Sequence, residues 1–328
     1  MPIIEMNDVS KTFQVHKRTV GFWNTLKSLV HREYETKVAV ERISFSIEPG
    51  ELVGYIGPNG AGKSTTIKML SGILTPSAGA IRVDGRVPHD NRRANAMHIG
   101  VVFGQRSQLY WDLPMIDTFE LYQKMFRIDN GRFRRNVDFY VELLEMGEFL
   151  NRPVRQLSLG QKMRAELAVA LLHDPKIVYL DEPTIGLDVV AKSRIRTFIR
   201  EVNKEKGTTV ILTTHDMDDI EQICSRIILI DRGSIMYDGT LSDFKSGFSR
   251  GHLLSVVFAD EDAELGEKRL QVVKSEGPRK QILFRSEEIS VGEAITHITR
   301  NFKVLDLQLK EPDIEEIIRD LYGKAKAN

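Results

Sequence analysis

The sequence predicts an α/β fold built on a parallel sheet, and three observations lead to this prediction. Residues 51–56 form a short apolar run rich in strand-forming residues, followed directly by a glycine-rich loop and a helical pattern. Residues 177–182 and 208–213 are continuous apolar runs, which are typical of strands buried on both faces of a parallel sheet. Helical patterns at 190–206 and 217–224 separate and follow these runs.

The glycine-rich loop, residues 57–65, matches the phosphate-binding pattern GxxxxGK[ST] at every fixed position. Its glycines allow backbone N–H groups to surround phosphate oxygens, and the N-terminus of the next helix adds positive potential. In this pattern Lys63 reaches the β- and γ-phosphates and Ser64 holds Mg²⁺. We therefore expect a nucleoside triphosphate to bind at Gly57, Asn59, Gly60, Gly62, Lys63, Ser64 and Thr65.

The composition is that of an ordinary globular protein. The 328 residues are 41% hydrophobic and 28% charged, and the formal net charge is zero, so no overall basic field favours nucleic acid. The single cysteine, Cys224, excludes an internal disulfide. We expect no signal peptide and no membrane span, because no window approaches 18 consecutive apolar residues.

Strands are expected at 2–6, 39–47, 80–85 and 98–103, and a basic segment, residues 14–37, follows the first of them. Within this segment, residues 21–33 have helical periodicity, with one apolar face and basic flanks. Such a helix fits a membrane surface or a partner subunit. A surface helix packed on its own domain fits the pattern equally well, and both interpretations stay open.

Residues 115–172 change character and predict a helical insertion into the α/β core. The expected helices are 115–126, 132–146 and 162–172, and Ser158 suits an N-cap position before the last. A strand pair at 225–231 and 234–238 then closes the first domain.

A serine- and glycine-containing stretch, residues 245–252, marks the expected domain boundary. We expect a first domain at 1–247 and a small α+β domain at 252–328. The second has the order strand, strand, strand, helix, strand, helix, at 253–258, 270–274, 280–285, 291–299, 303–309 and 312–321.

Three side chains near strand ends are candidates for chemistry on the bound triphosphate. Asp181 and Glu182 close a buried strand, where a carboxylate beside a phosphate loop can organise Mg²⁺ and a neighbouring carboxylate can position water. His215 follows another strand end, where an imidazole can contact a γ-phosphate.

The spaced motifs together resemble the ATP-binding cassette (ABC) ATPases. They are the loop 57–65, Gln105, the signature-like segment 157–161, the run 177–182, the segment 186–188 and His215. The resemblance implies a RecA-like core, an antiparallel β lobe and a helical subdomain at about 115–172. It also implies that two copies meet head to tail, each ATP lying between the loop of one copy and the signature segment of the other.

The resemblance also implies residue roles. Phe13 stacks on adenine, Gln105 and Asp181 join Ser64 at Mg²⁺, and Asp188 couples the two sites of the dimer. Glu182 acts as general base and His215 contacts the γ-phosphate. In trans, the signature contributes Ser158, Gly160 and Gln161. The sequence departs from the family pattern at two places. In the signature, Leu159 replaces the usual first glycine, which affects the signature geometry, and in the segment before Leu187-Asp188, Ile185-Gly186 replaces the usual Ser-Ala.

The segment 182–188, the extra C-terminal domain and its tail at 311–321 resemble the ATPase subunits of exporters of drugs, antibiotics or cell-surface polymers. The resemblance implies an ATP- and Mg²⁺-dependent subunit, peripheral on the cytoplasmic face of the membrane, with a transmembrane permease and a second copy as partners. The alternatives are a non-transport ABC ATPase acting on ribosomes or DNA, and an importer ATPase. The chain has one cassette, one cysteine and no sustained heptads, which disfavours the first. It also lacks the larger β-rich C-terminal domain of many importers.

Overall fold

The computed structural model describes residues 1–16, 34–104, 107–248, 251–260, 265–285, 288–310 and 314–327. The chain divides into two compact units, Met1–Thr240 and Leu241–Asn328. Within the described ranges, no helix is both long and apolar enough to span a membrane.

The first unit is built on a six-stranded sheet in the order β5-β6-β7-β3-β8-β9. Its strands are β3 (Leu52–Ile56), β5 (Ile99–Phe103), β6 (Ile177–Asp181), β7 (Thr209–Thr213), β8 (Arg226–Asp231) and β9 (Ser234–Thr240). All neighbouring pairs are parallel except β8 and β9. The α/β class and the parallel sheet predicted from the apolar runs are confirmed, because β6 and β7 are central and almost wholly buried.

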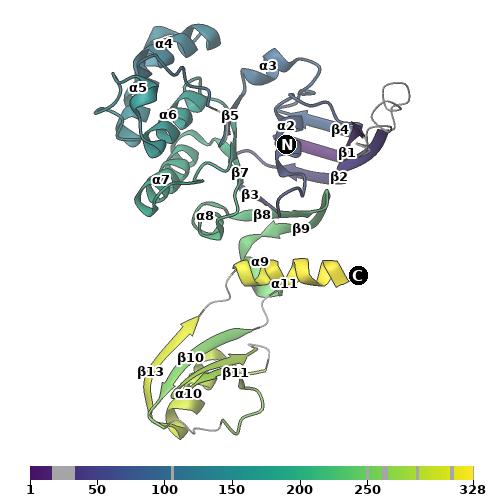
Figure 1. Cartoon of the computed structure of the whole chain (residues 1–328), viewed down its shortest axis with the longest axis vertical. Helices are drawn as coiled ribbons and strands as arrows, with labels where there is room; N and C mark the ends of the chain where they lie inside the picture. The colour runs from purple at the N-terminus through teal and green to yellow at the C-terminus, as the bar shows by residue number, and fades with distance from the viewer. Residues whose placement is uncertain are drawn as a thin grey trace, which may run out of the picture. The chain divides into compact units, whose positions relative to one another are not determined.

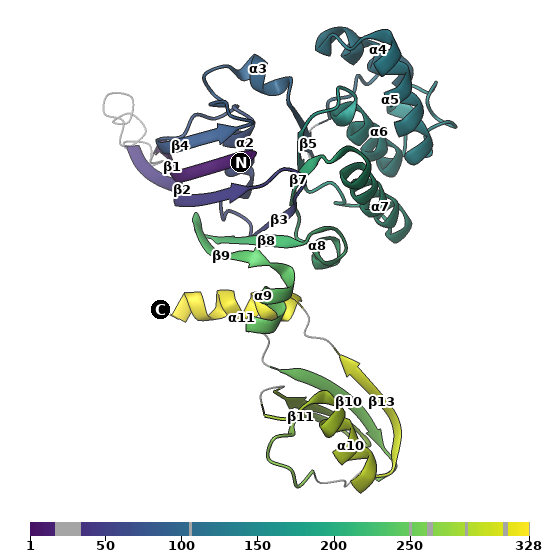
Figure 2. The same ribbon diagram turned by 180° about the vertical axis from the view of Figure 1, so that it is seen from behind.

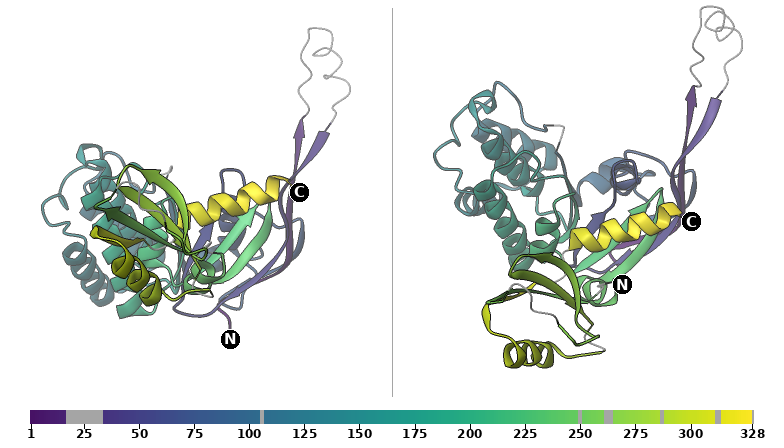
Figure 3. Two further views of the ribbon diagram at one scale, coloured as in Figure 1. Left: turned by 90° about the horizontal axis from the view of Figure 1, so that it is seen from below. Right: turned by 60° about the horizontal axis from the view of Figure 1, so that its bottom comes forward.

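A second, antiparallel sheet has the order β2-β1-β4. It consists of β1 (Ile4–His16), β2 (Tyr34–Ile47) and β4 (Ala78–Val83). β1 pairs with β4 only as far as Ser10, but it stays paired with β2 as far as His16. The two longer strands therefore extend beyond the rest of their sheet (Figure 3).

The first strand is much longer than the predicted 2–6. Residues 14–16 and 34–37, which the sequence assigns to the basic insertion, are strand residues in the structure. These residues form an exposed ribbon that is held by cross-strand backbone hydrogen bonds and has no buried face. Their sequence therefore lacks the alternation of apolar and polar residues that predicts a strand. The helix predicted at 21–33 lies outside the described residues.

Helices cover both faces of the six-stranded sheet (Figures 1 and 2). α2 (Lys63–Leu70) lies between the two sheets, and its Ile67 and Leu70 share one hydrophobic core with residues of both. α6 (Leu159–Leu171) and α7 (Val189–Lys206) cover the opposite face, and α8 (Met217–Ile223) lies beside α7. This layering leaves the carboxyl ends of β3, β6 and β7 together at one edge of the sheet.

The predicted helical subdomain is also present. α4 (Met115–Phe126), α5 (Asn130–Leu143), a 3₁₀ turn (Val154–Gln156) and α6 gather beside β5 (Figure 1). The sequence missed one short helix, α3 (Arg92–Ala96), which the side chain of Asn91 caps by accepting a hydrogen bond from Ala94 N. A single turn of helix is too short to show a hydrophobic period.

The second unit is a small α+β domain. Its antiparallel sheet has the order β11-β12-β10-β13 and consists of β10 (His252–Phe258), β11 (Gln271–Glu276), β12 (Arg279–Phe284) and β13 (Val304–Lys310). α10 (Val291–Asn301) packs on one face of the sheet through Ile298, and α11 (Ile314–Ala327) lies against α9 (Leu241–Phe248). The predicted order of elements is present, but the sequence missed α9, whose end overlaps the stretch 245–252.

Candidate functional site

The phosphate-binding loop connects β3 to α2. Gly62 caps α2 with φ of 112°, and a Cβ at this position would lie 2.6 Å from Ala39 O. A Cβ on Gly57 would lie 2.3 Å from Ile230 O. Only glycine allows both the left-handed conformation at Gly62 and these close backbone approaches. The local sequence therefore fixes the shape of the loop, and backbone N–H groups precede a helix N-terminus as anion binding requires.

Lys63 is almost buried and lies under this loop. Its Nζ donates to Gly57 O at 2.5 Å and to Pro58 O at 3.2 Å. Burial lowers the pKa of the ammonium group, while the carboxylates of Glu182 and Asp181 act in the opposite direction. A cation held between the loop and two carboxylates is positioned to bind the terminal phosphates.

Asp181 ends β6 opposite the first turn of α2. Ser64 Oγ donates to Asp181 Oδ2 at 3.1 Å, and Thr213 Oγ1 donates to Asp181 Oδ1 at 2.5 Å. A hydroxyl and a carboxylate are hard oxygen ligands, the type that Mg²⁺ prefers. Among the residues that the structure describes, no three His, Cys, Asp or Glu side chains gather as a metal site. The donor set at Ser64 and Asp181 fits a Mg²⁺ that takes its other ligands from phosphates and water.

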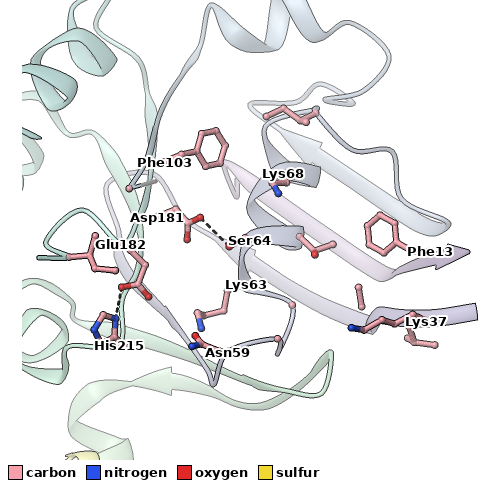
Figure 4. Close-up of a pocket in the computed structure, with 18 of the residues that line it drawn as sticks. Phe13, Lys37, Asn59, Lys63, Ser64, Lys68, Phe103, Asp181, Glu182 and His215 are labelled. Carbon is pink, nitrogen blue, oxygen red and sulfur yellow. Dashed lines mark hydrogen bonds and ion pairs between the residues drawn. The ribbon is translucent and has the colours of Figure 1, made fainter. Parts of the chain in front are cut away.

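Glu182 and His215 form a contacting pair beside this oxygen pair (Figure 4). His215 Nδ1 lies 2.6 Å from Glu182 Oε2. The Glu182 backbone has φ of 58°, a left-handed conformation that is uncommon for a residue with a side chain. Side chains in such conformations gather at functional sites, where the surrounding structure holds them in place.

These groups line one pocket of about 890 Å³, a size suited to a nucleotide. Asn59, Gly60, Thr65 and Phe13 line it together with the residues above (Figure 4). Phe13 lies at the far end from His215, and Lys11 Nζ is 5.2 Å from the centre of its ring. An aromatic ring at one end and phosphate-binding groups at the other match the two ends of a nucleoside triphosphate.

The signature segment lies elsewhere. Ser158 caps α6 by accepting from Gln161 N at 3.3 Å, and the Gln161 side chain accepts from Ser158 N at 2.9 Å. The N-cap position predicted for Ser158 is confirmed. Ser158, Gly160, Gln161 and Asp188 line a separate pocket of about 440 Å³, which shares no described lining residue with the loop pocket. Within one chain, therefore, the signature is not brought to the phosphate loop.

Asp188 caps α7, because its Oδ1 accepts from Ala191 N at 2.8 Å. Next to it, the side chain of Leu159 is 54% exposed, and a Cβ on Gly186 would lie 3.2 Å from Leu159 Cδ2. Leu159 thus occupies space that a glycine in the usual signature would leave open. Gln105 lies outside the described residues.

The structure adds pocket residues that the sequence analysis did not single out. Lys37, on β2, is paired with Phe13 across the strands, and Lys68 lies on α2; both line the loop pocket. Gly104 follows β5, and a Cβ there would lie 2.7 Å from Glu182 O. The only sequence signal for Gly104 is a glycine at a strand end, which is too common to assign to a site by itself.

Comparisons with known proteins agree with this geometry. Residues 40–185 match the family model described as ABC transporter. The chain is 29% identical over 307 residues to the linearmycin resistance ATP-binding protein LnrL of Bacillus subtilis (strain 168), covering 90% of this chain and 97% of that protein. It is 36% identical over 210 residues to the Nod factor export ATP-binding protein I of Burkholderia pseudomallei (strain 1710b), covering 64% of this chain and 68% of that protein.

A solved structure is similar over the cassette. It is the dimeric structure of a post-hydrolysis state of an ATP-binding cassette bound to ADP and Pi, with a TM-score of 0.60 and 26% identity, and the match covers 73% of this chain and 98% of that one. Both the phosphate loop and the end of β6 fall within the family match. The chain therefore belongs to the ATP-binding proteins of ABC transporters, a family of ATPases coupled to transport.

Proposed function

We propose that two copies of this chain enclose two ATP molecules head to tail and that hydrolysis drives a transmembrane exporter. The observation that carries the proposal is the separation of the loop pocket from the signature pocket within one chain. A signature segment that serves the loop must then come from another copy. The similar cassette that was solved as a dimer supports the participation of a second copy.

The loop pocket holds the nucleotide along its length. Phe13 stacks on the base, and the backbone N–H groups of the loop surround the β- and γ-phosphates. When phosphates enter, Lys63 exchanges its hydrogen bonds to loop carbonyls for charged oxygens, which are stronger acceptors. Lys37 and Lys68 add positive charge beside the ribose and phosphate positions.

Ser64 and Asp181 hold Mg²⁺ in this proposal, and Gln105 is a further ligand. A Mg²⁺ held by these residues would neutralise the negative charge that develops on the phosphates during hydrolysis. Asp181 stays in place because Thr213 binds its other oxygen. The carboxylate that would bind the metal is thereby held by residues of two neighbouring strands, β6 and β7.

Glu182 takes the proton from the attacking water. Its Oε2 contacts His215 Nδ1, which leaves Oε1 available to accept a proton. The imidazole then keeps the carboxylate in one orientation, and in this proposal it also contacts the γ-phosphate of the bound ATP. Loss of a positioned general base typically costs about 10²–10⁴-fold in rate.

A second copy also accounts for an apolar surface beside the signature. Leu159, Val189 and Val190 are 54%, 82% and 62% exposed. Large apolar side chains grouped in this way are typical of a surface that another protein covers. In the head-to-tail arrangement this surface faces the partner's loop, and Asp188 lies between the two nucleotide sites.

Export is the direction that the two named relatives support, since one is named for linearmycin resistance and the other for Nod factor export. The partner is then a transmembrane permease, and the chain is peripheral on the cytoplasmic face. The predicted helix at 21–33 stays a candidate for contact with the membrane or permease. Copurification of the tagged chain with a membrane protein supports this role, whereas copurification with ribosomal RNA or DNA supports the non-transport alternative.

The decisive experiment mixes two inactive variants. Lys63→Ala inactivates the loop of its own copy, and Ser158→Arg blocks the signature. In a head-to-tail arrangement, each mixed dimer has one site with an intact loop and an intact signature and should reach up to about half the ATPase activity of a wild-type dimer. Because about half of the dimers in an equal mixture are mixed, the mixture should recover up to about a quarter of the wild-type activity. If each chain uses its own signature, the mixture stays inactive and the proposal is wrong. Glu182→Gln in both copies should lower hydrolysis by about 10²–10⁴-fold, which identifies the activity as that of this site.

A further inference from the structure

We infer that Asp219 is a positioning residue for the Glu182–His215 pair, an inference that rests on the proposed function. Asp219 lies on α8 and is wholly buried. Thr184 and Thr214 both donate their hydroxyls to the same oxygen, Asp219 Oδ2, the second at 3.3 Å. Thr184 follows Glu182 by two positions, and Thr214 directly precedes His215. One carboxylate oxygen therefore joins the two segments that carry the catalytic pair.

The other oxygen of this carboxylate is bound from α7. Arg196 Nε donates to Asp219 Oδ1 at 2.5 Å, and the Arg196 side chain is only 9% exposed. The guanidinium group compensates the buried negative charge, so both oxygens of Asp219 are satisfied. A carboxylate bound on both oxygens in a buried site has little freedom to move.

The same arginine also reaches the residue after His215. Arg196 Nη2 lies 3.5 Å from Asp216 Oδ1, and Lys192 donates to the other oxygen of Asp216. Asp216 N in turn donates to Thr214 Oγ1 at 3.0 Å. The side chains on both sides of His215 are thus linked to α7, that of Asp216 directly and that of Thr214 through Asp219.

The catalytic pair needs such support for two reasons. Glu182 has a left-handed backbone, which persists only where neighbouring contacts hold it. The side chain of His215 is 65% exposed, so packing does not fix it. Neither Asp219 nor Arg196 is among the described residues that line the nucleotide pocket. Asp219 therefore acts through Thr184 and Thr214, without touching ATP.

The test compares Asp219→Asn with Asp218→Asn, which removes an exposed carboxylate from the same helix. For Asp219→Asn we expect kcat for ATP to fall at least about tenfold, since small displacements of reacting groups have effects of this size. KM for ATP and binding of a fluorescent ATP analogue should stay within about twofold, because the loop pocket is intact. Asp218→Asn should keep the wild-type kcat. Equal kcat values for the two variants overturn the inference.

Variants of the two threonines test the inference even if Asp219→Asn fails to fold. Thr184→Val and Thr214→Val keep the side-chain shape but remove the donors, and each should lower kcat with KM unchanged. Thr184→Ser restores the hydroxyl and should recover most of the rate. If both valine variants hydrolyse ATP like the wild type, or if serine gives no recovery, Asp219 does not position the pair.

A double variant separates positioning from general destabilisation. In a Glu182→Gln background, Asp219→Asn should lower the residual hydrolysis by a smaller factor than in the wild-type background, because one of the two groups that it positions is already replaced. A further loss of the same factor as in the wild-type background shows an effect independent of Glu182 and overturns the inference. Failure of the proposed function is recognised separately, as wild-type hydrolysis that is insensitive to Glu182→Gln.

Discussion

Ser64 Oγ donates to Asp181 Oδ2 at 3.1 Å across 117 positions of sequence, so the phosphate loop and the end of β6 share one oxygen site. The parallel sheet causes this meeting, because β3 and β6 end at the same edge, separated only by β7. A loop that binds phosphates and a strand end that binds metal thus become one site.

The first prediction concerns this oxygen pair. Asp181→Asn keeps the side-chain shape but removes the charge that favours Mg²⁺. At saturating ATP, we expect the free Mg²⁺ needed for half-maximal hydrolysis to rise at least about tenfold. The control is Asp138→Asn, which removes an exposed carboxylate from α5. An unchanged Mg²⁺ requirement for Asp181→Asn contradicts the assignment of the metal site.

The second prediction concerns Gly104. Because glycine has no Cβ, the end of β5 can lie close to the backbone of Asp181 and Glu182. A Cβ on Gly104 would lie 2.7 Å from Glu182 O and 2.9 Å from Asp181 O. Gly104→Ala must therefore displace the turn that carries both carboxylates. We expect kcat to fall at least about tenfold while nucleotide binding is retained. Gly147→Ala is the matched control, because a Cβ there meets nothing within 4 Å. Equal activity of the two alanine variants argues against a tight approach at Gly104.

The third prediction is a pH dependence of stability. His173 stacks on Phe126 with ring centres 3.9 Å apart, and its Nε2 hydrogen-bonds Ile99 O at 3.1 Å. Its Nδ1 is buried without a partner, so a second proton has no acceptor. Burial lowers the pKa of this imidazole to about 4.

The pKa of the His173 imidazole is lower in the folded chain than its ordinary value of 6.5, which applies to the unfolded chain. The neutral ring therefore stabilises the fold above pH 6.5, and this stability is lost as the pH falls toward 4. Between pH 7.5 and 5, the contribution of His173 to the free energy of unfolding should fall by about 2 kcal/mol. Glutamine at this position can still donate to Ile99 O but does not titrate. The free energy of unfolding of His173→Gln, measured by urea titration, should therefore fall by correspondingly less over the same pH range. The same substitution at half-buried His89 is the control. Parallel pH profiles for wild type and His173→Gln contradict the prediction.

Local patterns predicted much of the site. Three of its features depend on fewer than ten consecutive residues each: the phosphate loop, the strand that ends at Asp181 and the capping role of Ser158. The structure has all three as predicted. The apolar runs at β6 and β7 likewise indicated a buried parallel sheet, because only strands covered on both faces lack polar positions.

Other features depend on contacts that no local pattern shows. Thr184 and Asp219 lie 35 positions apart, and either alone is an ordinary polar residue. The long pairing of β1 with β2 involves exposed polar residues, whose sequence carries no period of buried side chains. The register of distant segments is set by the packed sheet, and only the folded chain reveals it.

The last prediction concerns the apolar surface beside the signature. Val189 opens α7 and its side chain is 82% exposed, so Val189→Asp removes no buried packing and adds a charge that a helix N-terminus favours. The variant should therefore melt like the wild type and bind a fluorescent ATP analogue normally. In a Glu182→Gln background, where bound ATP is hydrolysed only slowly, the aspartate should weaken ATP-dependent dimerisation at least about tenfold, because two copies then bury a charge. Sedimentation in the presence of ATP measures this, with Val273→Asp in the second unit as the exposed apolar control. A dimer that forms equally well with Val189→Asp places the second copy on another surface.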